Sequence, residues 1–239
     1  MRIVGIERLE FGVENIPEAA RFFRDFGLVE SAASTAVVQR FETLEGAEIV
    51  LRSTTDATLP PAVVPGSTIR KMVWGVESNA DLNAIAIDLG RDREVLREAD
   101  GSVHSTDPNG YGIAFAVTRR RSLPPVDAAV NFPGRPVRKN TPVDFKRRPV
   151  VRHLGHVVVF SPEIEPAERF YRERLQFRIS DRYPGRGTFL RASGAHDHHI
   201  ARPQQIGAGI EIAEARNLAC RIGRSVVPHR EAIGVGRSP

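Results

Sequence analysis

Hydrophobic and polar residues recur in the same order in two distant parts of the chain. Segments 9–28 and 156–177 each begin with a short apolar strand, pass through a turn of proline and glutamate, and enter a helix containing Arg-Phe and a further aromatic residue. Proline and acidic residues in the first turn are typical of a helix N-terminus. Apolar residues then fall at helical spacing, which predicts that each helix packs on a sheet. They are Phe22, Phe23 and Phe26 in one segment and Phe170, Tyr171 and Leu175 in the other.

Strand-like stretches follow both helices. They cover 36–43 and 47–53 after the first helix, and 177–181, 188–192 and 198–201 after the second. A further unit fits between them, with a strand at 69–77, a helix at 80–89 and strands at 94–99, 102–105 and 111–118. An Asp-Pro-Asn-Gly turn at 107–110 precedes the last of these strands. The order of one strand, one helix and three strands therefore occurs three times.

This repeat predicts an α+β fold of tandem βαβββ modules. Residues 1–120 would form an N-terminal domain of two complete modules, and residues 151–201 a third module. Between them, residues 121–150 are rich in proline and basic residues, which is typical of a linker. Segment 202–239 has no strand–helix–strand order and is shorter than the third module. We therefore expect an atypical tail at 202–239 and an incomplete C-terminal domain.

The modules resemble those of the vicinal oxygen chelate superfamily, which includes glyoxalase I, the bleomycin-resistance proteins and the type I extradiol ring-cleavage dioxygenases. The third module carries the most specific signal. Its motifs are His-Leu-Gly-His-Val-Val-Val at 153–159, Glu-Arg-Phe-Tyr at 168–171 and His-Asp-His-His-Ile-Ala at 196–201. They are similar to the metal-binding domain of the extradiol dioxygenases, whereas the first two modules are similar mainly in the order and spacing of their elements.

The resemblance implies a divalent metal bound by histidines of the third module. The histidine of the Gly-His-Val motif matches His156, and the second ligand matches His198. A one-residue slip would make His199 the second ligand. Iron(II) is the metal that the resemblance favours, with Mn(II) or Zn(II) as alternatives. His153 and His196 would then flank the ligands rather than belong to them.

The alternation of side chains along a strand agrees with such a pair. His156 shares one face of its strand with Val158, and His198 shares a face with Ile200, while His199 lies on the opposite side. In a curled module, the first and last strands can direct side chains into the same concave face. Imidazole is a common ligand of iron, manganese and zinc, so this pairing favours a metal site.

The resemblance also requires a carboxylate as third ligand. In extradiol enzymes it is a glutamate on the closing strand of a fourth module, which completes a site of two histidines and one carboxylate. Segment 202–239 contains Glu211, Glu214 and Glu231, but none of them follows a second Asp-Pro-x-Gly turn. We therefore expect any ring-cleavage activity of this chain to be impaired.

These features predict an extradiol-type dioxygenase that acts on small catechol-like aromatic compounds. The alternative is a non-catalytic or remnant protein that binds metal or a small aromatic ligand, and a third interpretation is a glyoxalase-like lyase. The motifs at 153–159 and 196–201 favour the dioxygenase over the lyase, whereas the missing carboxylate favours the remnant. The resemblance implies a structural role for the N-terminal modules, which lack matching ligands.

Charge and hydropathy narrow the range of partners. The net charge of +5 and the pI of about 10.0 would suit a nucleic-acid-binding protein. The basic residues of 135–152 lack an accompanying set of aromatic residues, so we expect a solvated linker and no nucleic-acid partner.

No apolar run approaches the roughly 20 residues of a spanning helix, and the first residues do not form a leader peptide, which predicts a cytoplasmic protein without a membrane partner. The third module would leave an unpaired sheet edge, which predicts a homo-oligomer.

Overall fold

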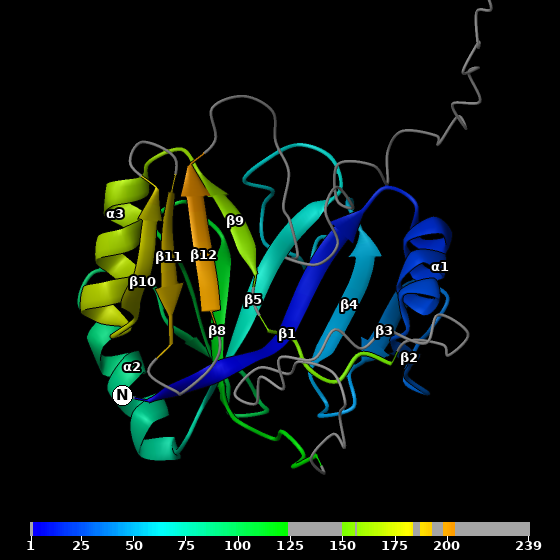
Figure 1. Ribbon diagram of the computed structural model, residues 1–239, viewed down its shortest axis with the longest axis horizontal. Coiled ribbons are helices and arrows are strands. Elements are labelled where there is room, and N and C mark those ends of the chain that lie inside the picture. The colour runs from blue at the N-terminus through cyan, green and yellow to red at the C-terminus, as the bar shows by residue number, and fades with distance from the viewer. Residues whose placement is uncertain (1, 124–149, 156, 184–186, 193–197, 204–239) are drawn as a thin grey trace, which may run out of the picture.

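The strands of the protein form two separate sheets (Figure 1). The computed structural model describes residues 2–123, 150–155, 157–183, 187–192 and 198–203. The first module consists of β1 (Ile3–Val13), α1 (Ile16–Phe26), β2 (Val29–Glu30), β3 (Val38–Glu42) and β4 (Glu48–Ser53). The second consists of β5 (Thr68–Val76), α2 (Asn79–Leu89), β6 (Leu96–Arg97), β7 (Val103–Thr106) and β8 (Gly112–Val117).

The third module repeats this order after residue 150. It consists of β9 (Val158–Ser161), α3 (Ile164–Arg169), the π-helical segment η1 (Phe170–Arg174), β10 (Arg178–Tyr183), β11 (Gly187–Arg191) and β12 (His198–Pro203). The order of one strand, one helix and three strands is thus confirmed for all three modules. Most of the linker expected at 121–150 and the tail beyond Pro203 lie outside the described residues.

The order of the strands in the two sheets shows that the modules are structural repeats. The first two modules share an eight-stranded sheet with the order β2-β3-β4-β1-β5-β8-β7-β6. Strands β1 and β5 meet antiparallel at its centre, and each runs parallel to the last strand of its own module. The third module forms a four-stranded sheet with the order β10-β11-β12-β9, in which β12 runs parallel to β9. The α+β fold of βαβββ modules is therefore confirmed.

The sequence sets the ends of the helices locally. The side chain of Asn15 accepts a hydrogen bond from the Glu18 backbone N–H (3.1 Å) and so caps the N-terminus of α1. Gly27 ends this helix in the left-handed conformation, with φ of 102°, which a residue without Cβ adopts at little cost. In α2, the Ser78 side chain has the same capping role toward Asp81 N (3.2 Å).

The two faces of the eight-stranded sheet differ in polarity. Apolar residues such as Leu9, Phe11 and Ile49 lie on the face covered by the helices and belong to the hydrophobic core. The opposite face is concave and carries polar residues from the alternate positions, including Arg8, Glu10, Arg40, Glu48 and Lys71. The core extends without interruption into the third module, because one cluster of buried residues includes side chains of both sheets.

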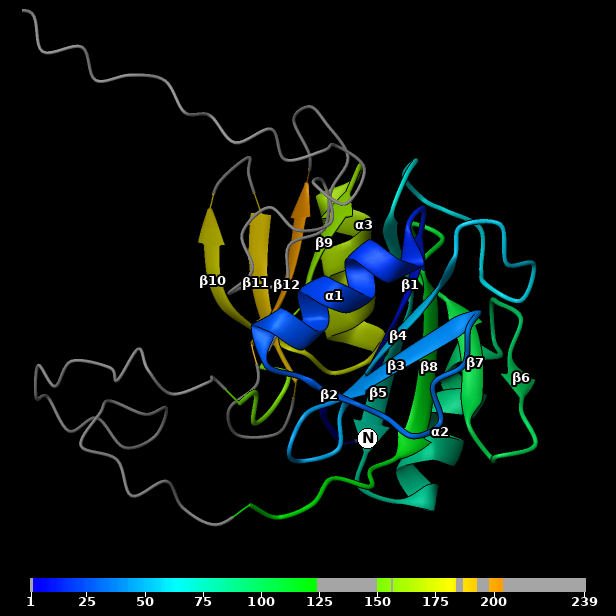
Figure 2. The same cartoon turned by 90° about the vertical axis from the view of Figure 1, so that its right-hand side faces the viewer.

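The third module packs against the second through aromatic side chains. The rings of Trp74 on β5 and Phe177 are nearly perpendicular, with 5.3 Å between their centroids, and Phe177 in turn contacts Tyr171 at 5.5 Å. Trp74 is 1% exposed, so this contact seals the core between the modules. Figure 2 separates the two sheets and shows how the third module stands beside the first two. The sequence predicted the modules but not this contact between them.

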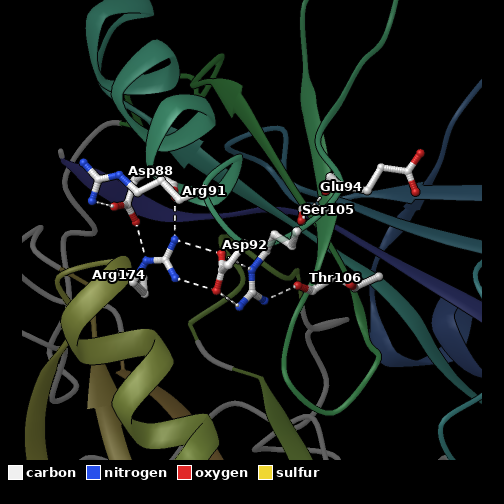
Figure 3. A network of polar contacts seen from close by, with 8 residues as sticks. Asp88, Arg91, Asp92, Glu94, Ser105, Thr106 and Arg174 are labelled. Atoms are coloured by element: carbon white, nitrogen blue, oxygen red, sulfur yellow. Dashed lines mark hydrogen bonds and ion pairs between the residues drawn. The ribbon is translucent and has the colours of Figure 1, made fainter.

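Charged groups fix the same interface at its margin (Figure 3). Arg174 of η1 reaches the C-terminal end of α2, where its guanidinium donates to Asp88 Oδ2 (2.6 Å), to the Asp88 carbonyl, and to both carboxylate oxygens of Asp92. Arg93 also bonds Asp92 and lies over the ring of Phe170, 4.5 Å from its centroid. A helix C-terminus favours a positive charge, so the arginine suits this end of α2.

The described parts of the linker lie against the N-terminal domain at both ends. Arg120 donates to Glu7 (3.2 Å), and Arg121 donates to the carbonyl of Leu44 (3.2 Å). Where the chain is described again, the carbonyl of Val151 accepts from the N–H of Leu44 (3.0 Å). The connection therefore leaves and returns beside the same β3–β4 turn. Across all the residues that the structure describes, no helix is long and apolar enough to cross a membrane.

Candidate metal site in the third module

The pairing of β9, β11 and β12 determines which residues share the concave face of the third module. His156 lies outside the described residues, and β9 begins two positions later at Val158. Strand β12 runs parallel to β9 with Ile200 opposite Val158. Strand β11 places Arg191 opposite His198 and Leu190 opposite His199.

This register separates positions 198 and 199. Directly opposed residues of an antiparallel pair lie on the same face of the sheet. Leu190 is 2% exposed and belongs to the hydrophobic core beneath the helix, so position 199 lies on the helix-covered face. Position 198, one residue away along β12, lies on the opposite, concave face together with position 200.

The first module provides a complete copy of the same arrangement. In both modules the helix starts three residues after the strand ends, at Ile16 and Ile164. The alignment makes Arg8 and Glu48 the counterparts of positions 156 and 198. The Nη1 atom of Arg8 lies 3.6 Å from Oε2 of Glu48, so side chains at these two places can meet. The counterpart of position 199 is Ile49, which is 1% exposed in the core.

The remaining residues expected at the site are only partly described. His153 is exposed in the segment that leads to β9, and it lies on neither of the paired strands. His196 and the glutamates of the tail (Glu211, Glu214 and Glu231) lie outside the described residues. Within the described part of the chain, no three His, Cys, Asp or Glu side chains are grouped closely enough to hold a metal ion.

The acidic side chain of α3 is engaged elsewhere. Glu168 accepts hydrogen bonds from Thr188 (2.7 Å) and Arg182 (3.2 Å), and Arg172 binds it one helical turn away. Burial raises the pKa of the Glu168 carboxyl, but the hydrogen bonds from Arg182 and Thr188 outweigh burial and leave this pKa below its usual value. Glu168 therefore ties α3 to the sheet and is not available as the missing carboxylate ligand.

The concave face of the N-terminal domain contains a cavity of about 440 Å³. Arg8, Glu48, Val73, Ser102 and Ala116 are among the residues that line it. Arg8 pairs with Glu48 of the same lining at 3.6 Å and with the neighbouring Glu10 at 2.8 Å. The cavity thus lacks the pair of histidines that the third module carries at the corresponding places.

A histidine does occur on this concave face, on β7. His104 Nε2 lies 2.7 Å from the Ser102 hydroxyl, which donates to Asp100. Burial lowers the pKa of His104, so the imidazole is neutral near pH 7. The Nε2 atom of His104 is therefore engaged with the Ser102 hydroxyl. His104, Ser102 and Asp100 form a local chain of hydrogen bonds.

A buried polar cluster at the module interface was not predicted from the sequence. Asp107, the first residue of the Asp-Pro-Asn-Gly turn, is 4% exposed and accepts from the Tyr171 hydroxyl (3.1 Å) and the Tyr111 N–H (3.0 Å). The Tyr111 hydroxyl donates to the Phe160 carbonyl on β9 (3.1 Å). Burial raises the pKa of Asp107 to about 6 despite these bonds. The sequence motif identified the turn at 107–110. The burial of the Asp107 carboxyl depends on the third module, which contributes Tyr171.

Comparisons with known proteins agree with the architecture. No protein-family model matches the chain. A segment of 54 residues is 39% identical to metapyrocatechase 2 of Cupriavidus necator, which represents 23% of this chain and 17% of that protein. A solved catechol 2,3-dioxygenase is similar over 88% of this chain and 70% of its own, with a TM-score of 0.61 and 18% identity.

Two further solved structures have different activities in their names. The Mn(II)-bound glyoxalase of Novosphingobium aromaticivorans is similar over 85% of this chain, with a TM-score of 0.58 and 19% identity. The E323L mutant of homoprotocatechuate 2,3-dioxygenase of Brevibacterium fuscum is similar over 84%, with a TM-score of 0.58 and 17% identity. The chain spans 62% and 54% of these two proteins, respectively.

The topology and these likenesses define the fold of the protein. Paired βαβββ modules around a concave sheet, shared with glyoxalase and catechol dioxygenases, are the vicinal oxygen chelate fold. This protein is a chain of that fold with a complete N-terminal pair of modules and a third module beside it.

Proposed function

We propose that this chain is an extradiol-dioxygenase-type protein whose third module contributes imidazole groups to a divalent metal. The observation that carries the proposal is the parallel pairing of β9 with β12, in which Val158 lies opposite Ile200. It is supported by the Arg8–Glu48 contact of 3.6 Å at the matching places of the first module. The substrate class would be small catechol-like aromatic compounds, as the names of the similar catechol and homoprotocatechuate dioxygenases indicate.

His156 would bind the metal, and His198, beside it on the concave face, would reach the metal or a molecule bound to it. We favour His198 over His199, because position 199 lies opposite the buried Leu190 of β11. Iron(II) is the metal we favour, with Mn(II) or Zn(II) as alternatives. The metal would lower the pKa of a catechol hydroxyl and hold the substrate in place. The two imidazoles supply neutral donors, so a third, negatively charged ligand is still needed for the usual iron site.

A glyoxalase-like lyase is the second candidate. It is supported by the likeness to the Mn(II)-bound glyoxalase, which matches this chain as well as the dioxygenases do. A non-catalytic protein that binds metal or a small aromatic ligand follows if no third ligand exists. In all three cases, we propose a cytoplasmic protein divided at 1–120, 121–150, 151–201 and 202–239.

Metal titration by calorimetry tests the site. We expect the purified chain to bind Fe(II) or Zn(II) weakly and His156→Ala to abolish binding. His198→Ala should weaken binding strongly if His198 is a ligand, and only slightly if it contacts a bound molecule instead. His199→Ala and His153→Ala are the matched controls and should bind like the unaltered chain. Equal losses in all four variants would contradict the assignment.

Ring cleavage is tested on the chain loaded anaerobically with Fe(II) and then mixed with catechol and air. We expect little or no yellow ring-opened product, because two imidazoles without a carboxylate hold the iron weakly and leave its coordination geometry poorly defined. Turnover at the rate usual for enzymes, about 10 per second, would show that a carboxylate of this chain serves as third ligand. Activity on a thiohemiacetal substrate instead would favour the lyase.

A further inference from the structure

A buried arginine on the concave face of the N-terminal domain lacks an acidic partner. Arg70 is 7% exposed, and its guanidinium donates to the carbonyls of Pro60 (3.1 Å) and Thr54 (3.5 Å). Its Nε atom is buried without a hydrogen-bond partner, and no carboxylate of the described residues forms an ion pair with it. Burial lowers the pKa of Arg70, and no neighbouring acid offsets this. A buried cation of this kind is costly unless a negative charge compensates it.

A β-bulge explains why Arg70 lies on this face. Strands β1 and β5 pair Glu10 with Lys71 and Phe11 with Ile69, which leaves Arg70 as the extra residue between two successive pairs. Such a bulge redirects the side chain of the extra residue. The guanidinium consequently lies over Gly12, where an added Cβ would come within 2.9 Å of Nε. The glycine provides the space that the arginine occupies.

Two further unpartnered polar atoms belong to the same row of the sheet. Gly12 is paired with Arg52 of β4 on one side and with Thr68 of β5 on the other. The Oγ1 atom of Thr68 and the Nε atom of Arg52 are both buried without a hydrogen-bond partner. Arg52 donates through Nη1 to Asp56 (3.0 Å), so one acid is present for two arginines. The row around Gly12 therefore combines three unused hydrogen-bonding atoms with an excess positive charge.

The β4–β5 loop, residues 54–67, closes this end of the sheet. The loop is held to Arg70 through two of its carbonyls and to Arg52 through Asp56. In Figure 1 it is the cyan segment that joins the upper ends of these two strands. Pro60 lies so close to Gly112 that a Cβ there would come within 2.7 Å of its ring. The loop therefore packs closely on β8 at this point.

We propose that a chloride-sized anion binds beneath this loop, held by Arg70, Thr68 and Arg52. All three unused atoms can donate a hydrogen bond, and two of them belong to cations. A water molecule would leave the charge of the buried Arg70 uncompensated, so an anion fits better. The anion would also neutralise Arg70 and fasten the loop that covers the concave face. This site is separate from the metal site of the third module.

Chloride titration tests the proposal on the full chain. We expect the ³⁵Cl resonance to broaden in its presence and its Tm to rise with sodium chloride more than with sodium gluconate at equal ionic strength. A crystal soaked in bromide should give an anomalous peak between Arg70 Nε and Thr68 Oγ1. A carboxylate of the chain at that place, or water alone with no chloride-specific effect, would overturn the proposal.

Two variants and a control make the test independent of folding defects. Thr68→Val keeps the shape of the side chain and removes one donor, so chloride affinity should fall by about tenfold. Arg70→Met should abolish the chloride-dependent shift of Tm. Arg2→Met removes an exposed arginine that pairs with Glu77 and should leave chloride binding unchanged. An unaltered chloride response in a folded Thr68→Val or Arg70→Met protein would refute the site.

Discussion

Asp107 is a carboxyl group that is buried among neutral donors. Two backbone N–H groups and the Tyr171 hydroxyl bind it, but no cation does so among the described residues. Burial outweighs these bonds and raises its pKa from 3.8 to about 6. The folded protein therefore retains a proton on Asp107 at pH values where the unfolded chain has already lost it.

This raised pKa predicts that stability falls as the pH rises from about 4 to 7. Below pH 4 both states are protonated, and between the two pKa values only the folded state keeps the proton, so each step upward in pH disfavours folding. The difference of about two pKa units corresponds to a contribution of about 3 kcal/mol. Denaturant unfolding at pH 4.5, 5.5 and 7 measures it.

The variant Asp107→Asn isolates this contribution. Asparagine cannot ionise, and its amide can donate to the Tyr171 oxygen, so the pH dependence between 4 and 7 should flatten. Asp25→Asn, on the exposed side of α1, is the control and should keep the dependence of the unaltered chain. An equally steep dependence in Asp107→Asn would assign the effect to another group.

Phe177 is predicted to be the most costly single truncation at the interface. Its ring fills the space between Trp74 and Tyr171, so Phe177→Ala should destabilise the protein by about 3–5 kcal/mol. Trp74 is the one tryptophan of the sequence, so its fluorescence reports this contact directly. We expect a red shift in Phe177→Ala and none in Phe26→Ala, which removes a partly buried ring on α1. A red shift of equal size in both variants would contradict this.

At the scale of elements, the hydrophobic pattern predicted most strands and helices within a few residues, but it began the first strand at residue 9 and missed the first half of β1 (Ile3–Val13). Apolar alternation sets strands such as β5 and β8, and the capping residues Asn15 and Ser78 set the helix starts. The pattern did not reveal β2, which has two residues, or the π-helical form of η1. These depend on neighbouring strands and on tertiary packing, neither of which a local pattern contains.

At the candidate metal site, too, the sequence predicted some features and the arrangement of the strands was needed for others. The sequence motif named His156 and His198 and left His199 as an alternative, because neighbouring histidines are distinguished only by the register of the sheet. The pairing of β12 with β11 distinguishes the two positions through the buried neighbour Leu190. Neither the sequence nor the strand register identified a third ligand. Among the described residues, no acidic side chain lies in a group of three that could hold a metal ion.

The π-helical segment η1 directs Arg174 toward α2, and this predicts a role in docking. Arg174→Ala removes its bonds to Asp88 and Asp92, which lie partly in solvent and are therefore screened. We expect a loss of about 1 kcal/mol and a lower unfolding midpoint in urea. Arg172→Ala, two residues earlier, breaks only the exposed pair with Glu168 and is the control. A stability unchanged by Arg174→Ala would show that the aromatic contacts hold the modules alone.

At the scale of the whole molecule, the sequence predicted the modules but not how the third one rests on the second. The residues that join them, such as Trp74, Tyr111 and Phe177, are separated by long stretches of chain. Each looks like an ordinary core residue of its own module. Contacts of this kind depend on the complementary shapes of two folded modules. The hydrophobic periodicity of the sequence contains no information about that complementarity.

We predict that the chain self-associates through β9. This strand lies at one edge of the four-stranded sheet, whereas its counterpart β1 has a partner strand on each side. Sedimentation velocity should show a concentration-dependent dimer. Phe160→Lys, which replaces a partly buried ring of this strand by a charge, should shift the equilibrium to the monomer in a protein that still folds. Ser180→Lys on β10, at the other edge, should not, and a monomer at every concentration would refute the prediction.

The antiparallel contact of β1 with β5 has a consequence for the symmetry of such a dimer. In the eight-stranded sheet, this contact relates two unlike modules by an approximate two-fold rotation. Two identical copies that joined β9 to β9 in the same antiparallel manner would be related by an exact rotation of this kind. The internal pseudo-symmetry of the N-terminal domain would then reappear as the point group of the assembly, with one continuous sheet crossing the axis.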